Sequence, residues 1–124
     1  MRISAAVLDA PDANALAAFY ARLLDWTIVE DTPGWVRVRH PSGELTPAGL
    51  SFAHEEQYVE PVWPATADAQ QMMVHLDIAC DDLASAVEWA IECGARLADF
   101  QPQPHVRVMF DPFGHPFCLF EGPV

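Results

Sequence analysis

The amino-acid sequence predicts an α+β fold built from two copies of one strand-helix-strand-strand-strand (βαβββ) module. The first observation is an internal repeat, in which residues 7–20 align with residues 76–89 at an offset of 69. The second is that each copy places an apolar strand before an amphipathic helical pattern. The third is a length of 124 residues with 52% apolar residues, which suits one domain with a proper core.

Module 1 is predicted at about residues 1–55. It begins with an apolar strand at 3–8, and Asp12 is a good N-cap for the helix that follows. One apolar stripe with helical spacing runs along this helix to about residue 24, formed by Leu16, Phe19, Tyr20 and Leu23. Three short strands are predicted after it, at 26–30, 35–39 and 49–54.

Module 2 is predicted at about residues 71–124, after a linker at about 56–70. Its first strand is expected at 72–79, with Asp81 as the helix N-cap and Gly94 just past the helix end. Further strands are expected at 95–99, 105–110 and 116–120. Turn sequences precede the last strand of each module, at 41–43 and 112–114. One face of each sheet is covered by its helix, so function is sought on the other face.

The charge and composition of the chain limit the classes of molecule that it is expected to bind. The chain has 18 acidic residues against 6 basic ones, with a net charge of −12. This field repels nucleic acid and anionic membranes and favours a neutral or cationic ligand, although solubility alone also explains it. No apolar run reaches the length of a membrane span or of a signal peptide. Three cysteines without close pairing argue against a disulfide framework, so we expect a cytoplasmic protein.

Three segments carry a resemblance to a known family. They are residues 8–12 leading into a helix, residues 74–78, and residues 111–121 with the pattern D-P-x-G-x-x-F-x-L-x-E. Together they resemble the vicinal oxygen chelate superfamily and its glyoxalase-like domain subgroup, which includes glyoxalases, extradiol dioxygenases, fosfomycin-resistance enzymes and bleomycin-binding proteins. The resemblance implies an open eight-stranded cup with the helices outside, and a homodimer.

The resemblance also implies positions for a metal site. In metal-dependent relatives each module supplies two ligands to one divalent ion, from its first and last strands. The positions carried over are His75 and Glu121 in module 2, where Glu121 is also the candidate to move a proton, and Ala6 and Ala53 in module 1. Because alanine cannot bind a metal, half a site remains. We therefore expect no cofactor, with a divalent metal ion as the alternative and His54 as a neighbouring candidate ligand.

Alternation along strands predicts which side chains line the cup. The expected ligand-binding residues are Leu8, Trp35, Ser51, Tyr58, Trp63, Asp77, Phe117 and Leu119. The aromatic ones can stack on a planar ligand, or can instead cover sheet edges and subunit interfaces. Arg37 and Arg39 either hold an anionic group or simply face solvent. For His75 and Glu121 the alternatives are a hydrogen-bonded pocket residue and a solvated strand end.

The leading functional hypothesis is a protein that binds a small organic molecule. It would sequester or carry an aromatic or cationic compound, because alanines widen the cup and acidic charge attracts cations. The alternative is a metal-dependent lyase, isomerase or dioxygenase using His75 and Glu121. A structural or regulatory module without small-molecule chemistry is the third possibility.

Overall fold

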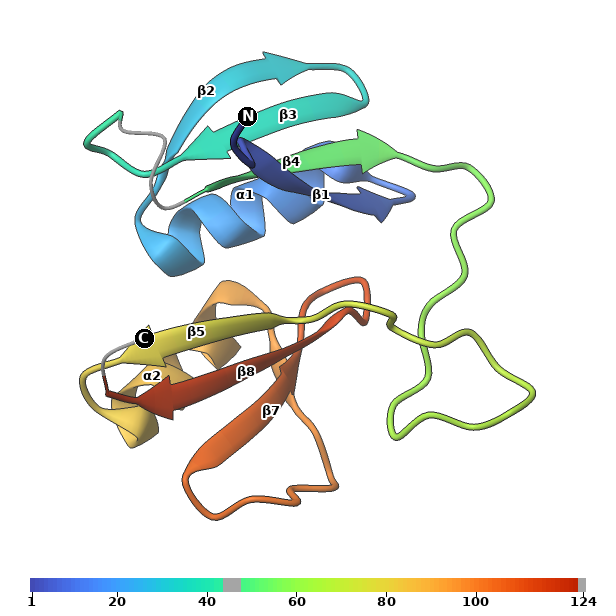
Figure 1. The fold of residues 1–124 in the computed structure, drawn as a ribbon, viewed down its shortest axis with the longest axis vertical. Coiled ribbons are helices and arrows are strands. Elements are labelled where there is room, and N and C mark those ends of the chain that lie inside the picture. The colour runs from blue at the N-terminus through green and yellow to red at the C-terminus, as the bar shows by residue number, and fades with distance from the viewer. Residues whose placement is uncertain (44–47, 123–124) are drawn as a thin grey trace. The chain divides into compact units, whose positions relative to one another are not determined.

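A computed structural model describes residues 1–43 and 48–122 and contains the βαβββ order twice (Figure 1). The first module comprises β1 (Ala5–Ala10), α1 (Ala13–Leu24), β2 (Thr27–Thr32), β3 (Trp35–Arg39) and β4 (Gly49–His54). The second comprises β5 (Leu76–Cys80), α2 (Leu83–Cys93), β6 (Arg96–Leu97), β7 (Val106–Phe110) and β8 (Pro116–Glu121). The predicted α+β class with two such modules is confirmed.

The modules correspond to two compact units, Met1–Tyr58 and Val59–Val124. Most of the predicted linker therefore belongs to the second unit. Each unit has a four-stranded sheet, ordered β1-β4-β3-β2 in the first and β5-β8-β7-β6 in the second. In both, the outer first strand pairs in parallel with the last strand, and the other pairs are antiparallel. No helix in the described part of the chain is long and apolar enough to cross a membrane.

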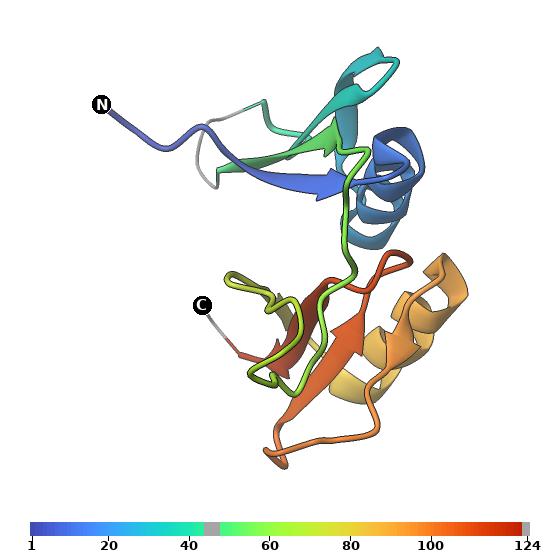
Figure 2. The same ribbon diagram turned by 90° about the vertical axis from the view of Figure 1, so that its right-hand side faces the viewer.

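One face of each sheet is packed against the helix of its own unit (Figure 2). In the first unit Tyr20 of α1 stacks on Phe52 of β4, with ring centroids 5.6 Å apart, and both side chains are fully buried. Val36 and Val38 are buried beside them. The amphipathic stripe read from the sequence is thus the side of α1 that enters the core.

The two helices begin and end with comparable caps. The Asp12 carboxylate accepts the Ala15 N–H at 3.0 Å, as predicted. In the second unit the capping residue is Asp82, whose Oδ1 accepts the Ser85 N–H at 2.8 Å, and the prediction of Asp81 was wrong. Two neighbouring aspartates satisfy the same local preference, so the sequence alone chose the wrong one. The structural repeat at this point is therefore 70 residues.

Two strands of the second unit are shorter than predicted. The first begins at Leu76, because the backbone turns sharply at Met73, where φ is +62° and Val74 N–H donates to the carbonyl of Met72. Strand β6 ends at Leu97, after which the Gln101 side chain takes the place of a neighbouring strand. Its amide donates to the carbonyls of Ala98 and Val108 and accepts the Val108 N–H at 2.9 Å.

Candidate functional site

The strand register of the second unit decides which side chains share its open face, the face away from α2. Strands β5 and β8 place Asp77 opposite Cys118 and Cys80 opposite Glu121. Because side chains alternate along a strand, His75, Asp77 and Cys118 lie on one face and Glu121 lies on the other. The sequence prediction placed Glu121 on the open face. Cys118, three residues earlier on the same strand, was thereby placed on the other face and was missed.

Glu121 is held at the start of α2. Its Oε1 accepts the N–H of Leu83, the first residue of that helix, at 2.9 Å, which satisfies an otherwise unpaired helix donor. Its strand position is opposite Cys80, whereas His75 precedes Leu76, which is opposite Phe117. At about 3.3 Å per residue the two positions are roughly 16 Å apart along the strand. The structure therefore corrects the prediction that His75 and Glu121 meet at one ion.

Several predicted cup-lining residues belong to the helix-covered faces instead. Phe117 and Leu119 share the parity of Glu121 and are 0% and 2% exposed. In the first unit Ala6 is opposite Leu50 and Leu8 is opposite Phe52, which faces α1. For Ala6 and Leu8 the cause is the repeat offset, since a slip of one residue moves every side chain of a strand to the other face.

Three further residues named in the sequence analysis, Trp35, Tyr58 and His54, all lie in the first unit. Trp35 and Ala53 are opposite each other on the open face of the first unit, next to the Arg37–Ser51 pair. Tyr58 is partly buried at the end of that unit, where its N–H donates to the carbonyl of Glu55 at 3.2 Å. His54 lies on the same side of β4 as Phe52, the side that faces α1. Its Nδ1 lies 3.0 Å from the carbonyl oxygen of Pro11.

A cluster of three potential metal ligands lies on the open face of the second unit. His75 Nε2 is 3.2 Å from Asp77 Oδ1, and one ligand atom from each of His75, Asp77 and Cys118 lies within 4.8 Å of the other two. Burial, followed by the negative charge of Asp77 and a hydrogen bond to it, raises the pKa of the Cys118 thiol. The thiol is thus protonated at neutral pH and is a poor nucleophile on its own.

The chemistry of these donors fits one divalent ion. Imidazole nitrogen, carboxylate oxygen and thiolate sulfur are the usual ligands of zinc, and three protein ligands leave one position for water or substrate. Small rotations of the side chains would bring three atoms that lie within 4.8 Å to the spacing of one coordination sphere. When bound, such an ion would polarise a carbonyl or activate water.

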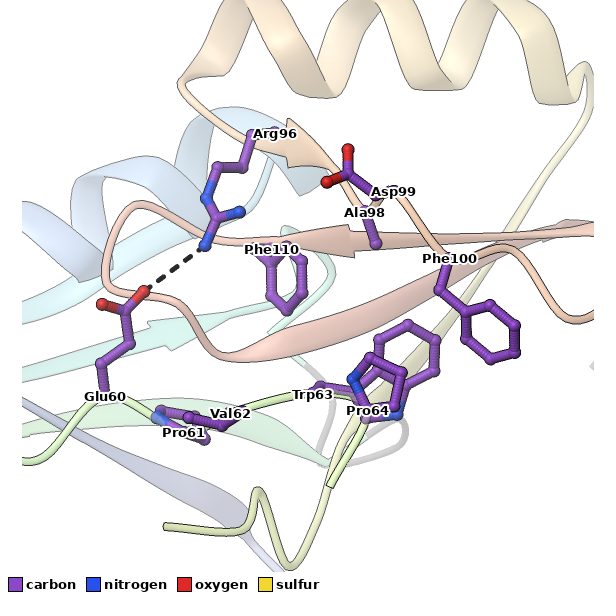
Figure 3. A pocket seen from close by; sticks show the side chains of 10 residues that line it. All are labelled: Glu60, Pro61, Val62, Trp63, Pro64, Arg96, Ala98, Asp99, Phe100 and Phe110. Atoms are coloured by element: carbon purple, nitrogen blue, oxygen red, sulfur yellow. Dashed lines mark ion pairs between the residues drawn. The ribbon is translucent and has the colours of Figure 1, made fainter. Parts of the chain in front are cut away.

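The open face of the second unit carries an aromatic groove, which we define by Trp63, Phe100 and Phe110 and show in Figure 3. It has a volume of about 410 Å³. Trp63 lies with its ring centroid 5.8 Å from Phe100 and 6.4 Å from Phe110. Phe110 and Ala98 belong to a buried cluster against which Trp63 packs. The segment before β5 thus brings an indole ring onto the sheet.

Charged side chains lie at the edge of the aromatic groove. The Arg96 guanidinium carbon lies 4.3 Å from the centroid of the Phe110 ring, and Arg96 Nη2 lies 3.5 Å from Glu60 Oε1. Asp99 also lines the groove (Figure 3) and makes no ion pair with any described residue. The groove therefore already holds one cationic group between an aromatic face and a carboxylate.

A second hollow, of about 300 Å³, adjoins the metal-ligand cluster. Its lining includes Trp63, Met72, His75, Val108 and Cys118. Trp63 lines both this hollow and the aromatic groove. Sequence analysis identified Trp63 and His75 as site residues, and the structure brings them to one hollow.

Comparisons with known proteins agree with this architecture. The model of a family described as glyoxalase-like domain matches residues 5–120. No curated protein matches the chain significantly in sequence.

Solved structures with similar folds come from several bacteria. A glyoxalase/bleomycin resistance protein/dioxygenase family enzyme from Burkholderia phytofirmans has a TM-score of 0.70 at 17% identity, over 95% of this chain and 96% of that chain. A glyoxalase-related enzyme from Fulvimarina pelagi has a TM-score of 0.69 at 18% identity, over 99% and 89%. An antibiotic binding protein from a Streptomyces species has a TM-score of 0.60 at 15% identity, over 99% and 97%.

Proposed function

This chain belongs to the glyoxalase-like domain family, and we propose that it binds a flat, cationic aromatic compound in order to sequester or carry it. The binding site is the aromatic groove on the open face of the second unit. The observation that carries this proposal is the placement of Trp63 beside Phe100 and Phe110, with carboxylates at the groove edge.

Stacking supplies the affinity for an aromatic ligand. The indole of Trp63 and the ring of Phe100 are tilted at 37° to each other with centroids 5.8 Å apart, and Phe100 is 53% exposed. A planar ligand gains about 0.5–1.5 kcal/mol from each such aromatic contact, beyond the apolar area that it buries.

Charge selects for a cation. The Arg96 guanidinium lies over the Phe110 ring with Glu60 as its counter-ion, and this arrangement supports a groove suited to planar cations. Asp99 adds a second carboxylate, and the net charge of −12 draws cations toward the protein from a distance. The antibiotic binding protein from Streptomyces has the same fold, which makes binding without catalysis a reasonable expectation.

The experiment measures binding of acridine orange, a flat aromatic cation, against naphthalene sulfonate, a flat aromatic anion. We expect saturable binding of the cation, weaker binding of the anion, and about tenfold lower cation affinity in Trp63→Leu. Trp89→Phe is the matched control, because Trp89 lies on α2, away from the groove. Equal affinity for both dyes, or an unchanged affinity in Trp63→Leu, would contradict the proposal.

A metal-dependent lyase, isomerase or dioxygenase is the second candidate, favoured by the cluster of His75, Asp77 and Cys118. Metal analysis of the purified protein tests it. A stoichiometric divalent ion that is lost in His75→Ala would support the enzyme over the binding protein. Substitution with cobalt gives a further readout, because a thiolate–cobalt absorption band should be present in the wild type and absent in Cys118→Ser.

A homodimer in the cytoplasm completes the proposal. Within each unit the first strand is an edge of its sheet, and exposed apolar side chains such as Val7, which is 54% exposed, lie on these edges. Unpaired edges are commonly covered by a second chain. Light scattering on the purified protein tests the dimer, which a monomer at all concentrations would exclude.

A further inference from the structure

The open face of the first unit differs from the proposed ligand site. Arg37 and Arg39 alternate along β3 with the buried Val36 and Val38, so both guanidinium groups lie on the face away from α1. We define these two residues as the arginine pair. Two of the six basic residues of a strongly acidic chain are thus neighbours on one face.

A cavity of about 330 Å³ adjoins the arginine pair. It is lined by both arginines and by Thr27, Val29, His40, Pro41 and Gly43. The ring of His40 can contribute a further donor. Its Nδ1 accepts the N–H of Ser42 at 3.1 Å, so Nε2 is the ring nitrogen left to donate. The cavity therefore combines hydrogen-bond donors with a small apolar wall.

The positive charge of the pair is only partly balanced. Arg37 Nη1 lies 3.3 Å from Glu30 Oε2. Arg39 Nη1 instead donates to the carbonyls of Val38 and Leu50, at 2.8 Å each, which orients its guanidinium without neutralising it. Burial, followed by the charge of Arg37, lowers the pKa of Arg39, while Glu30 acts in the opposite direction. Two guanidinium groups and one carboxylate leave an excess of one positive charge.

We propose that this cavity binds the oxyanion group, carboxylate or phosphate, of a small organic molecule, with Arg37 and Arg39 as its ligands. Guanidinium groups bind such anions through paired, charge-assisted hydrogen bonds. A bound anion would also remove the repulsion between the two arginines. This site lies on the first unit and does not depend on the cation proposed for the second.

The test uses the full chain and two probes, inorganic phosphate and benzoate, at constant ionic strength. The arginine side-chain N–H signals in nitrogen-15 NMR spectra report on the site. We expect saturable shifts of the Arg37 and Arg39 signals. Binding of phosphate would assign the site to phosphates, and binding of benzoate alone would assign it to organic carboxylates next to the apolar wall. If neither probe shifts the Arg37 and Arg39 signals, the proposal is overturned.

Variants separate a built site from general electrostatic attraction. Arg37→Gln should weaken binding about tenfold, the size of a lost charge-assisted hydrogen bond. Glu30→Gln should strengthen it several-fold, because a competing carboxylate disappears. Arg22→Gln removes the same charge from α1, on the other side of the sheet, and should leave affinity unchanged. The proposal would be overturned by weaker anion binding in Glu30→Gln, or by equal losses of affinity in Arg22→Gln and Arg37→Gln. If Arg37→Gln fails to fold, the affinity of Glu30→Gln still tests the proposal.

Discussion

The open faces of the two units share one scaffold but carry different chemistry. Equivalent positions follow from the registers, in which Val7 is opposite Ser51 in the first unit and Asp77 is opposite Cys118 in the second. By the same pairing, Arg37 is opposite Ser51 and Val108 is opposite Cys118. The arginine pair of the first unit therefore occupies the places of Val108 and Phe110 in the second.

This exchange shows how a repeated fold acquires two kinds of surface. The helix-facing side chains form a core in both units, whereas the open faces carry different residues. The helix caps are 70 residues apart, and the same offset relates Ala5 and Val7 of the first strand to His75 and Asp77. In the last strand, Ser51 of the first unit corresponds to Cys118 of the second. Among the described residues, the cluster of His75, Asp77 and Cys118 thus lies in one unit and the arginine pair in the other.

The largest expected effect tests which face of the second sheet is open. Phe117→Ala should reduce the free energy of unfolding by about 3–5 kcal/mol, because Phe117 is fully buried on the α2 side. Phe100→Ala, on the exposed edge of the aromatic groove, should cost much less. Urea denaturation measures both. Similar costs for the two would break the assignment of faces on which the comparison depends.

A smaller effect compares equivalent turns in the two units. Gly43 and Gly114 have φ angles of +71° and +89°, so alanine at either position costs about 1–2 kcal/mol of stability. An added Cβ at Gly43 meets nothing within 4 Å, whereas at Gly114 it meets the Glu60 side chain. Only Gly114→Ala should therefore also weaken binding of the aromatic cation, several-fold, by displacing Glu60. Titrating acridine orange into both variants checks this, and equal affinities would remove Glu60 from the site.

The smallest effect tests the 70-residue offset. Asp82→Ala should lower the urea midpoint, and Asp81→Ala should change it less, because Asp82 caps α2. Hydrogen bonds to Ser85 lower the pKa of Asp82 below its usual value of 3.8. A lowered pKa stabilises the folded state above the unfolded-state pKa, and this stability is lost as the pH falls through the folded-state value. The difference in urea midpoint between wild type and Asp82→Ala should thus shrink below about pH 4. A difference in midpoint that does not depend on pH would argue for Asp81 as the cap.

Local patterns were sufficient for the architecture and insufficient for the site. The module repeat, the apolar stripe of α1 and the turns before the last strands could all be read from neighbouring residues. Cys118 could not, because the parity of β8 depends on pairing with β5, some 40 residues earlier along the chain. An error of one residue at Asp81 was enough to carry Ala6 and Leu8 to the wrong face.

The sequence by itself determined that two βαβββ modules form, because helix stripes and strand runs are local and periodic. Only the tertiary structure decided that His75 meets Asp77 and Cys118 while Glu121 joins α2. It also placed Trp63 on the sheet. These outcomes depend on strand register and on contacts between distant segments, which no local pattern encodes.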